Sequence, residues 1–182
     1  MAIAAYDDVL KFWLEDATYS QWFARDDVFD ASIRKRFSQT HAAAITAELW
    51  HWRRSPQGRL AEIIVIDQFS RNLHRNSAQA FAYDSMALAL AQEAIENGDD
   101  EKLDKVQRRF LYMPFMHSES AIIHEVAMQL FTAIDDENTL KYEKLHKKII
   151  DKFGRYPHRN AVLGRKSTKE EEAFLKEPNS SF

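Results

Sequence analysis

Between Phe153 and Thr168 the sequence groups side chains that could bind an anion. The stretch carries five basic side chains and no acidic one, with two of the four glycines and one of the four prolines. Because the whole chain has a formal net charge of -3, we expect a local positive focus here. A second interpretation is a solvated connector whose arginines pair with surface carboxylates. The predicted ligand-binding residues are Arg155, Arg159, Asn160 and Arg165, with His158 as an acid–base group.

A second polar segment, Asp67 to His74, follows an apolar helical pattern. Asp67, Arg71 and His74 are spaced i, i+4 and i+7, so a continuing helix would carry them on one face. A partly buried Asp67 needs a partner, and Arg71 is the nearest in sequence. The pair is either an ordinary intrahelical ion pair or an aspartate that orients an arginine toward a ligand. The candidate base is Asp67, and the candidate binding residues are Gln68, Arg71, Asn72 and His74.

The third segment contains His117, Ser118 and Glu119. His117 directly precedes Ser118, which is the predicted N-cap of a helix. The positive end of a helix favours a neutral imidazole and can receive an anion. His117 is a candidate acid–base group and Glu119 a candidate base, although a structural histidine at a helix start is the other interpretation.

Aromatic side chains mostly indicate a core, with one exception. Trp22 lies in the segment 18–26, which we expect to be a loop outside any long helix. Its ring could form a wall of a binding pocket. Trp22 therefore joins the predicted ligand-binding residues.

Composition excludes several classes of site. The chain has no cysteine, which rules out disulfides, thiolate zinc sites and iron–sulfur clusters, and its histidine spacing matches no metal motif. We predict no metal and no cofactor. The weakly acidic balance argues against nucleic acid as a partner. No signal peptide and no membrane-spanning stretch is apparent, so we predict a cytoplasmic protein without a membrane partner. The sequence does not indicate an oligomeric state.

The elements that must position these residues are helices. Few glycines and prolines, abundant helix formers and recurring i, i+3, i+4 apolar spacing predict an all-α fold. Residues 1–182 are predicted to form one domain, with 178–182 as a frayed tail. The first predicted helix follows Asp7-Asp8, the second spans 27–50, and the third begins at Ser55-Pro56. The fourth runs from Ser77 to Asn97-Gly98, and the fifth spans 103–112 up to a break at Met113-Pro114. The sixth begins at Ser118 with Val126 facing inward, the seventh ends at Gly154, and the last begins at a capping box in 167–170.

The three polar segments described above, taken together, resemble one protein family. Asp67-Gln68-Phe69-Ser70-Arg71-Asn72, Pro114 to Glu119, and Phe153 to Thr168 are similar, in this order, to the DUF924 family. Val9 to Trp13 and Trp22-Phe23 also look like the opening of that family. The resemblance covers nearly the whole chain and implies an all-α, tetratricopeptide-like array of antiparallel helix pairs. The family is one of unknown function, so the resemblance implies no reaction.

Three functions fit these residues. The leading hypothesis is a pocket, formed where the three polar segments converge, that binds or acts on a small anionic or phosphorylated metabolite. The alternative is a tetratricopeptide-like scaffold that binds a peptide or an acidic motif. A third possibility is a buried polar network that locks the C-terminal segment onto the core.

Overall fold

The computed structural model describes residues 2–178 and 180–181, and every regular element in these residues is a helix. The prediction of an all-α protein is therefore confirmed. The chain divides into two compact units, residues 1–75 with 79–114 (unit 1) and residues 76–78 with 115–182 (unit 2). The prediction of a single domain stays a prediction, as does the tetratricopeptide-like arrangement.

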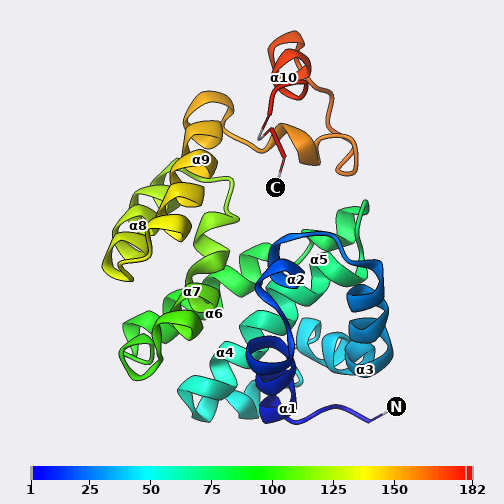
Figure 1. Cartoon of the computed structure of the whole chain (residues 1–182), viewed down its shortest axis with the longest axis vertical. Helices are drawn as coiled ribbons and strands as arrows, with labels where there is room; N and C mark the ends of the chain where they lie inside the picture. Colours follow the sequence, from blue (N-terminus) through cyan, green and yellow to red (C-terminus); the bar gives the residue numbers. More distant parts are fainter. Residues whose placement is uncertain (1, 179, 182) are drawn as a thin grey trace. The chain divides into compact units, whose positions relative to one another are not determined.

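The α-helices follow one another along the chain with short connections (Figure 1). They are α1 (Tyr6–Leu10), α2 (Tyr19–Phe23), α3 (Asp27–Ile45), α4 (Pro56–Ile64), α5 (Ser70–Leu73), α6 (Asp84–Glu96), α7 (Lys105–Met116), α8 (Ala121–Ala133), α9 (Glu137–Phe153) and α10 (Lys169–Phe174). The π-helices are η1 (Lys11–Asp16) and η3 (Val65–Phe69). The 3-10 helices are η2 (Trp50–Arg54), η4 (Ala78–Ala80), η5 (Asp100–Lys102) and η6 (Pro157–Arg159).

Unit 1 is built around aromatic side chains from η1, α3 and η3. The rings of Phe12, Trp13, Phe37 and Phe69 are all buried, with centroids 5.0–6.3 Å apart in the pairs that touch. Such edge and tilted contacts add to the stabilisation that comes from burying the rings. α3 packs beside η3 and α5, and this packing fixes the polar residues that follow Ile66.

Local capping sets the start of α4 but not the start of α6. Ser55 accepts a hydrogen bond from the Gly58 amide and Pro56 occupies the first turn, as predicted. The helix predicted from Ser77 begins only at Asp84, so that expectation is wrong. Asp84 lies in the first turn, where the helix dipole favours a carboxylate, and it also pairs with Arg71.

Two helix ends also differ from the expected positions. α3 stops at Ile45 and not near Trp50, because Ala47 adopts a positive φ of 60° that ends the helix. α7 continues through Pro114 to Met116. A proline this close to the end of a helix disturbs only the last turn, so the predicted break at Met113-Pro114 is wrong.

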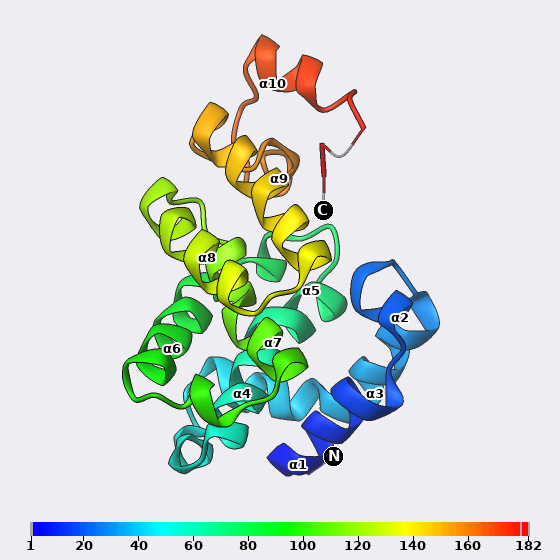
Figure 2. The ribbon, with the colours of Figure 1, turned by 60° about the vertical axis from the view of Figure 1, so that its left-hand side comes forward.

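In unit 2, α8 and α9 form a hairpin and lie side by side in both views (Figures 1 and 2). α8 begins after Ser120 and not Ser118, because residues 117–119 form a bend whose polar groups bind elsewhere. Val126, which the apolar spacing places inward, is 38% exposed, whereas His124 is fully buried.

The ends of the later helices follow the expected signals more closely. α9 ends at Gly154, whose φ of 67° is the left-handed conformation predicted for its C-cap. α10 starts with a capping box between Thr168 and Glu171, one residue later than expected. Asn179 and Phe182 of the predicted frayed tail lie outside the described residues, and Ser180 donates to the Leu175 carbonyl.

Candidate functional site

A cavity of about 270 Å³ lies in unit 1, where α3, the end of α5 and the start of the segment before α6 meet. We call it the histidine cavity. Its lining contains no acidic residue among those described. The lining residues are Arg34, Ser38, His41, Ala42, Ile45, Leu73, His74, Gln79 and Tyr83.

His41 enters this cavity from the buried stripe of α3 and is only 4% exposed. Its Nε2 lies 2.8 Å from Oγ of Ser70, and the Ser70 hydroxyl donates its single hydrogen to the Ile66 carbonyl. With that hydrogen committed, Nε2–H of His41 must donate to Ser70, which leaves Nδ1 as an acceptor. Within the described residues Nδ1 has no hydrogen-bond partner.

His74 lies beside His41, with the ring centroids 5.5 Å apart. Burial, followed by the effect of His74, lowers the pKa of His41 to about 4. Burial, followed by the positive charge of Arg34, lowers the pKa of His74 as well. Both imidazoles are therefore neutral at pH 7, and each offers both a donor and an acceptor nitrogen.

Arg34 supplies the positive charge of the cavity. Its Nη2 donates to the Leu73 carbonyl at 2.7 Å, which caps the C-terminal end of α5. No carboxylate among the described residues forms an ion pair with it, although its side chain is exposed at the cavity. Its remaining N–H groups are thus placed to bind a ligand.

Arg71 is held differently, because two carboxylates surround it. Its guanidinium donates to both oxygens of Asp84 at 2.9 and 3.0 Å and to Oδ1 of Asp67 at 3.1 Å. Gln68 donates to the other oxygen of Asp67 at 2.6 Å. The expected Asp67–Arg71 pair is present, and Asp84 is the partner that sequence reasoning missed.

Asn72 belongs to a second network in unit 1. Its amide donates to Asp30 of α3 at 2.7 Å, and Arg75 forms a bidentate pair with the same carboxylate. These bonds tie α5 to α3, just as the Arg71–Asp84 pair ties α5 to α6. Gln68, Arg71 and Asn72 therefore hold the turn that carries His74. Asp67 and Gln68 also lie in a π-helix, a geometry that is common at functional sites.

In unit 2, the bend at 117–119 and the basic stretch 153–168 come together. Glu119 accepts two hydrogen bonds from Arg165, at 2.6 and 2.9 Å, and a third from the Tyr156 amide at 2.7 Å. Burial raises the pKa of Glu119, but these bonds and the nearby Arg159 outweigh it and leave the pKa lowered. Asn160 completes the group, since it accepts from Arg165 and donates to Ser167.

The expectation that these arginines lack acidic partners is wrong. Arg155 makes a bidentate pair with Glu171 at 2.7 and 2.8 Å, and Arg165 pairs with Glu119. Both carboxylates come from outside the basic stretch. Hydrogen bonding to Arg155 lowers the pKa of Glu171 to about 2. The positive focus expected from the sequence is therefore neutralised at two of its arginines.

The remaining predicted residues of this stretch surround the buried ring of Tyr156. The guanidinium carbon of Arg159 lies 4.5 Å from the Tyr156 ring centroid, and Nη2 donates to the His117 carbonyl at 3.1 Å. The His158 ring lies 5.5 Å from the same ring. Tyr156 and Pro157 are buried and anchor the stretch, whereas Leu163 is 36% exposed and does not.

A buried histidine–glutamate pair, which sequence reasoning did not identify, lies next to Tyr156. His124 Nδ1 is 2.7 Å from Oε1 of Glu143, and both side chains are fully buried. His124 Nε2 faces the Ser118 carbonyl at 2.9 Å, so this nitrogen must carry a proton. Burial raises the pKa of Glu143. The pair therefore shares one proton between Nδ1 and Oε1.

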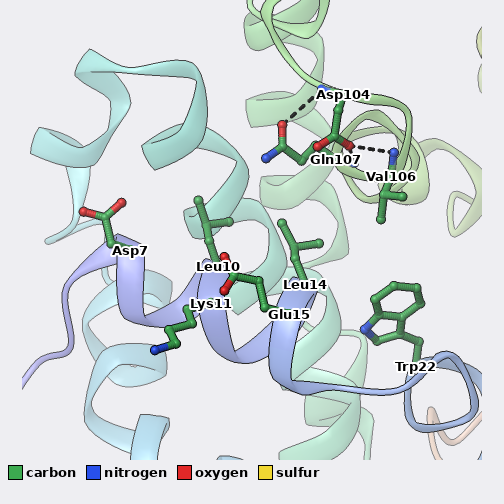
Figure 3. Close-up of a pocket in the computed structure, with 9 residues that line it drawn as sticks. All are labelled: Asp7, Leu10, Lys11, Leu14, Glu15, Trp22, Asp104, Val106 and Gln107. Carbon is green, nitrogen blue, oxygen red and sulfur yellow. Dashed lines mark hydrogen bonds between the residues drawn. The ribbon is translucent and has the colours of Figure 1, made fainter.

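The predicted convergence of all three polar segments stays a prediction, because the segment 67–74 belongs to unit 1 and the other two belong to unit 2. Trp22 lies apart from the histidine cavity and lines a separate groove (Figure 3). Sequence reasoning found His74 but missed Arg34, His41 and Tyr83. The available signal was a histidine in the inward stripe formed by Ile33, Phe37 and Ala44.

The described part of the chain contains no cluster of three or more histidine or acidic side chains suited to a metal ion. None of its helices combines the length and apolar character needed to cross a membrane.

Comparison with known proteins gives the chain its family. The model of DUF924, bacterial protein of unknown function, matches residues 9–179. A solved structure of a protein of unknown function from Agrobacterium tumefaciens is similar, with a TM-score of 0.90 and 35% identity over 94% of this chain and 96% of that chain. No curated protein matches. The chain belongs to the DUF924 family of bacterial proteins of unknown function.

Proposed function

We propose that the protein binds a small anionic metabolite in the histidine cavity. The observation that carries this proposal is Arg34, a guanidinium at the cavity with no acidic partner among the described residues. Phosphate and carboxylate groups accept paired hydrogen bonds from an arginine in this state. Arg71 and Arg75 are already neutralised by carboxylates and do not offer the same site.

The size and lining of the cavity support a ligand with a polar and an apolar part. Its volume of about 270 Å³ is near the lower end for small-molecule sites and equals roughly nine water molecules. Ala42, Ile45 and Leu73 supply apolar surface, and Tyr83 supplies a hydroxyl. A phosphorylated or carboxylated metabolite of a few carbon atoms matches these features.

The two histidines would interact with the rest of the ligand through their ring nitrogens. Nδ1 of His41 can accept a hydrogen bond from a ligand hydroxyl, because its Nε2 is already engaged with Ser70. If His74 takes up a proton when the anion arrives, the anion stabilises the imidazolium. Binding should then strengthen as the pH falls. His41 is the group best placed for proton transfer if a reaction follows binding.

The other predicted site residues support this site indirectly in our proposal. Asp67, Gln68, Arg71 and Asn72 position α5 and so His74. Glu119, Arg165, Asn160 and Arg155 hold the C-terminal stretch through contacts within unit 2. The convergence of the segments, the tetratricopeptide-like arrangement and a cytoplasmic location remain part of the proposal and are not needed for its test.

Thermal unfolding in inorganic phosphate tests the proposal. At roughly tenfold excess over the dissociation constant, a ligand of the folded state adds about 1.4 kcal/mol, which raises the Tm by about 3–6 °C. Sodium chloride must hold the ionic strength constant, since screening alone changes stability. Arg34→Ala should abolish most of this rise. Lys35→Ala, which removes the same charge from the next residue of α3, should keep it.

An equal phosphate response in Arg34→Ala and wild type would exclude the histidine cavity as the anion site. A rise with short acidic peptides, and none with phosphate or small carboxylates, would favour the scaffold alternative.

A further inference from the structure

A groove of about 580 Å³ lies in unit 1 between the N-terminal helices and the start of α7 (Figure 3). One wall is the outer face of α1 and η1, and the facing wall is the start of α7. Trp22 lies at one end and Asp7 at the other. We call it the N-terminal groove. Its lining residues are Asp7, Leu10, Lys11, Leu14, Glu15, Trp22, Asp104, Val106 and Gln107.

The floor of the groove is apolar and partly open to solvent. Leu10 and Leu14 are half-buried, and Val106 is 36% exposed. Trp22 donates Nε1–H to the Trp13 carbonyl at 2.7 Å, which fixes the indole at the end of the groove. On α2, Tyr19 and Phe23 continue the aromatic surface, both about half exposed.

The rim of the groove is acidic. Asp7 and Glu15 on one wall form no ion pair with any described residue, and neither does Lys11 between them. On the opposite wall, Asp104 accepts hydrogen bonds from the amides of Val106 and Gln107 and has no cationic partner in the described part of the chain. Three carboxylates and one ammonium give the rim a net negative charge.

The spacing of these residues fits an elongated partner. Asp7, Leu10, Leu14 and Glu15 follow one another along the wall that α1 and η1 form. The two acidic side chains stand at the ends of this line, and the two leucines lie between them. A helix laid in a groove is elongated in the same way and presents its anchors at i, i+3, i+4 and i+7. Part of the wall is the π-helix η1, a geometry that is common at functional sites.

We propose that the N-terminal groove binds an amphipathic helical segment of a partner protein, whose apolar face is flanked by lysine or arginine side chains. The apolar side chains would cover Leu10, Leu14 and Val106, and the basic ones would pair with Asp7, Glu15 and Asp104. This proposal does not depend on anion binding in the histidine cavity, since the two sites share no lining residue.

Fluorescence anisotropy with the full-length protein tests the proposal. The probe is a labelled helical peptide of about 14 residues with leucines at i, i+4 and i+7 flanked by lysines; a second peptide has glutamates in place of the lysines. We expect saturable binding of the lysine peptide, at least about tenfold tighter than the glutamate peptide. Glu15→Lys should weaken it about tenfold. Asp16→Lys, the same charge change one residue outside the lining, should weaken it less than about twofold.

A second pair of variants tests the apolar floor. Val106→Ser should weaken the lysine peptide about fivefold, because it removes apolar area from the groove. Val28→Ser is the matched control, since Val28 is exposed at the equivalent position of α3, where its amide also bonds to a capping aspartate. Equal weakening by Glu15→Lys and Asp16→Lys, equal affinity for the two peptides, or no saturable binding would overturn the proposal.

Discussion

His41 illustrates how the protonation of one side chain can be set by a neighbour that never touches a ligand. Ser70 is 1% exposed and gives its hydrogen to the Ile66 carbonyl, so its oxygen can only accept from His41. This arrangement selects the Nε2–H tautomer and leaves Nδ1 available at the cavity. The His124–Glu143 pair is governed by the same reasoning, because the Ser118 carbonyl demands a proton on Nε2.

Ser70→Ala tests this reasoning at the scale of a residue. Removal of the hydroxyl leaves Nε2–H of His41 buried without an acceptor, which should lower the free energy of unfolding by about 1–3 kcal/mol. Ser38→Ala is the matched control, because Ser38 also donates to the carbonyl four residues earlier but no histidine binds it. It should change stability by less than about 0.5 kcal/mol. Similar urea midpoints for the two variants would show that the His41–Ser70 bond contributes little.

Among the helices, the close packing of α4 against η2 depends on Gly58. A Cβ atom built on Gly58 would lie 2.0 Å from the Trp52 carbonyl oxygen, which belongs to the backbone and cannot rotate away. The same contact places Arg53 for its bidentate bond to the fully buried Glu62. The glycine is therefore required by space at this position.

We expect Gly58→Ala to destabilise the protein by about 2–3 kcal/mol, since the backbone of η2 must move. A Cβ atom on Gly98 would meet no neighbouring atom, but the backbone there has a φ of +65°. Gly98→Ala should therefore lower the free energy of unfolding by about 1 kcal/mol. Chemical denaturation of both variants checks this order. If Gly58→Ala were the milder change, the close approach of α4 and η2 would not be a constraint.

Local signals predicted several elements well. Ser55-Pro56 and Gly154 mark helix boundaries through their own backbone chemistry, so a few neighbouring residues suffice to identify them. The start of α6 at Asp84 and the π-helix η3 depend on packing against distant residues and could not be deduced locally. The candidate site follows the same division. His74 stands out in its own segment, whereas Arg34 and His41 come from α3 and lie 40 and 33 residues earlier.

In the basic stretch 153–168, the local sequence suggested a feature that the structure does not have. The stretch itself contains no acidic residue, which suggests free arginines. Glu171 and Glu119, which lie outside the stretch in sequence, form ion pairs with Arg155 and Arg165. Local charge excess therefore does not establish a free cation, because tertiary structure can supply the partner.

At the scale of the whole molecule, buried histidines should make stability depend on pH. Burial lowers the pKa of His146 to about 3. Burial, followed by the effect of the neighbouring His74, lowers the pKa of His41 to about 4. Between about pH 6.5 and these values the unfolded chain binds protons that the folded protein does not. The free energy of unfolding must therefore fall as the pH falls through this range. The raised pKa of Glu143 acts in the opposite sense.

Urea unfolding at about pH 7.5 and pH 5 measures this effect. Each of the two histidines should account for a loss of about 2 kcal/mol between these pH values. His146→Gln and His41→Gln should each remove about that much of the pH dependence, whatever their stability at pH 7.5. Unchanged pH dependence in both buried variants would contradict the assignment.

The most direct test of the central claim, anion binding in the histidine cavity, is an NMR titration of the histidine rings with phosphate at constant ionic strength. The chain has seven histidines. We predict saturable shifts of the His41 and His74 ring nitrogens, with His41 starting as the Nε2–H tautomer. Arg34→Ala should remove these shifts and Lys35→Ala should keep them. If phosphate left both rings unchanged, or moved all seven alike in wild type and Arg34→Ala, the histidine cavity would not be an anion site.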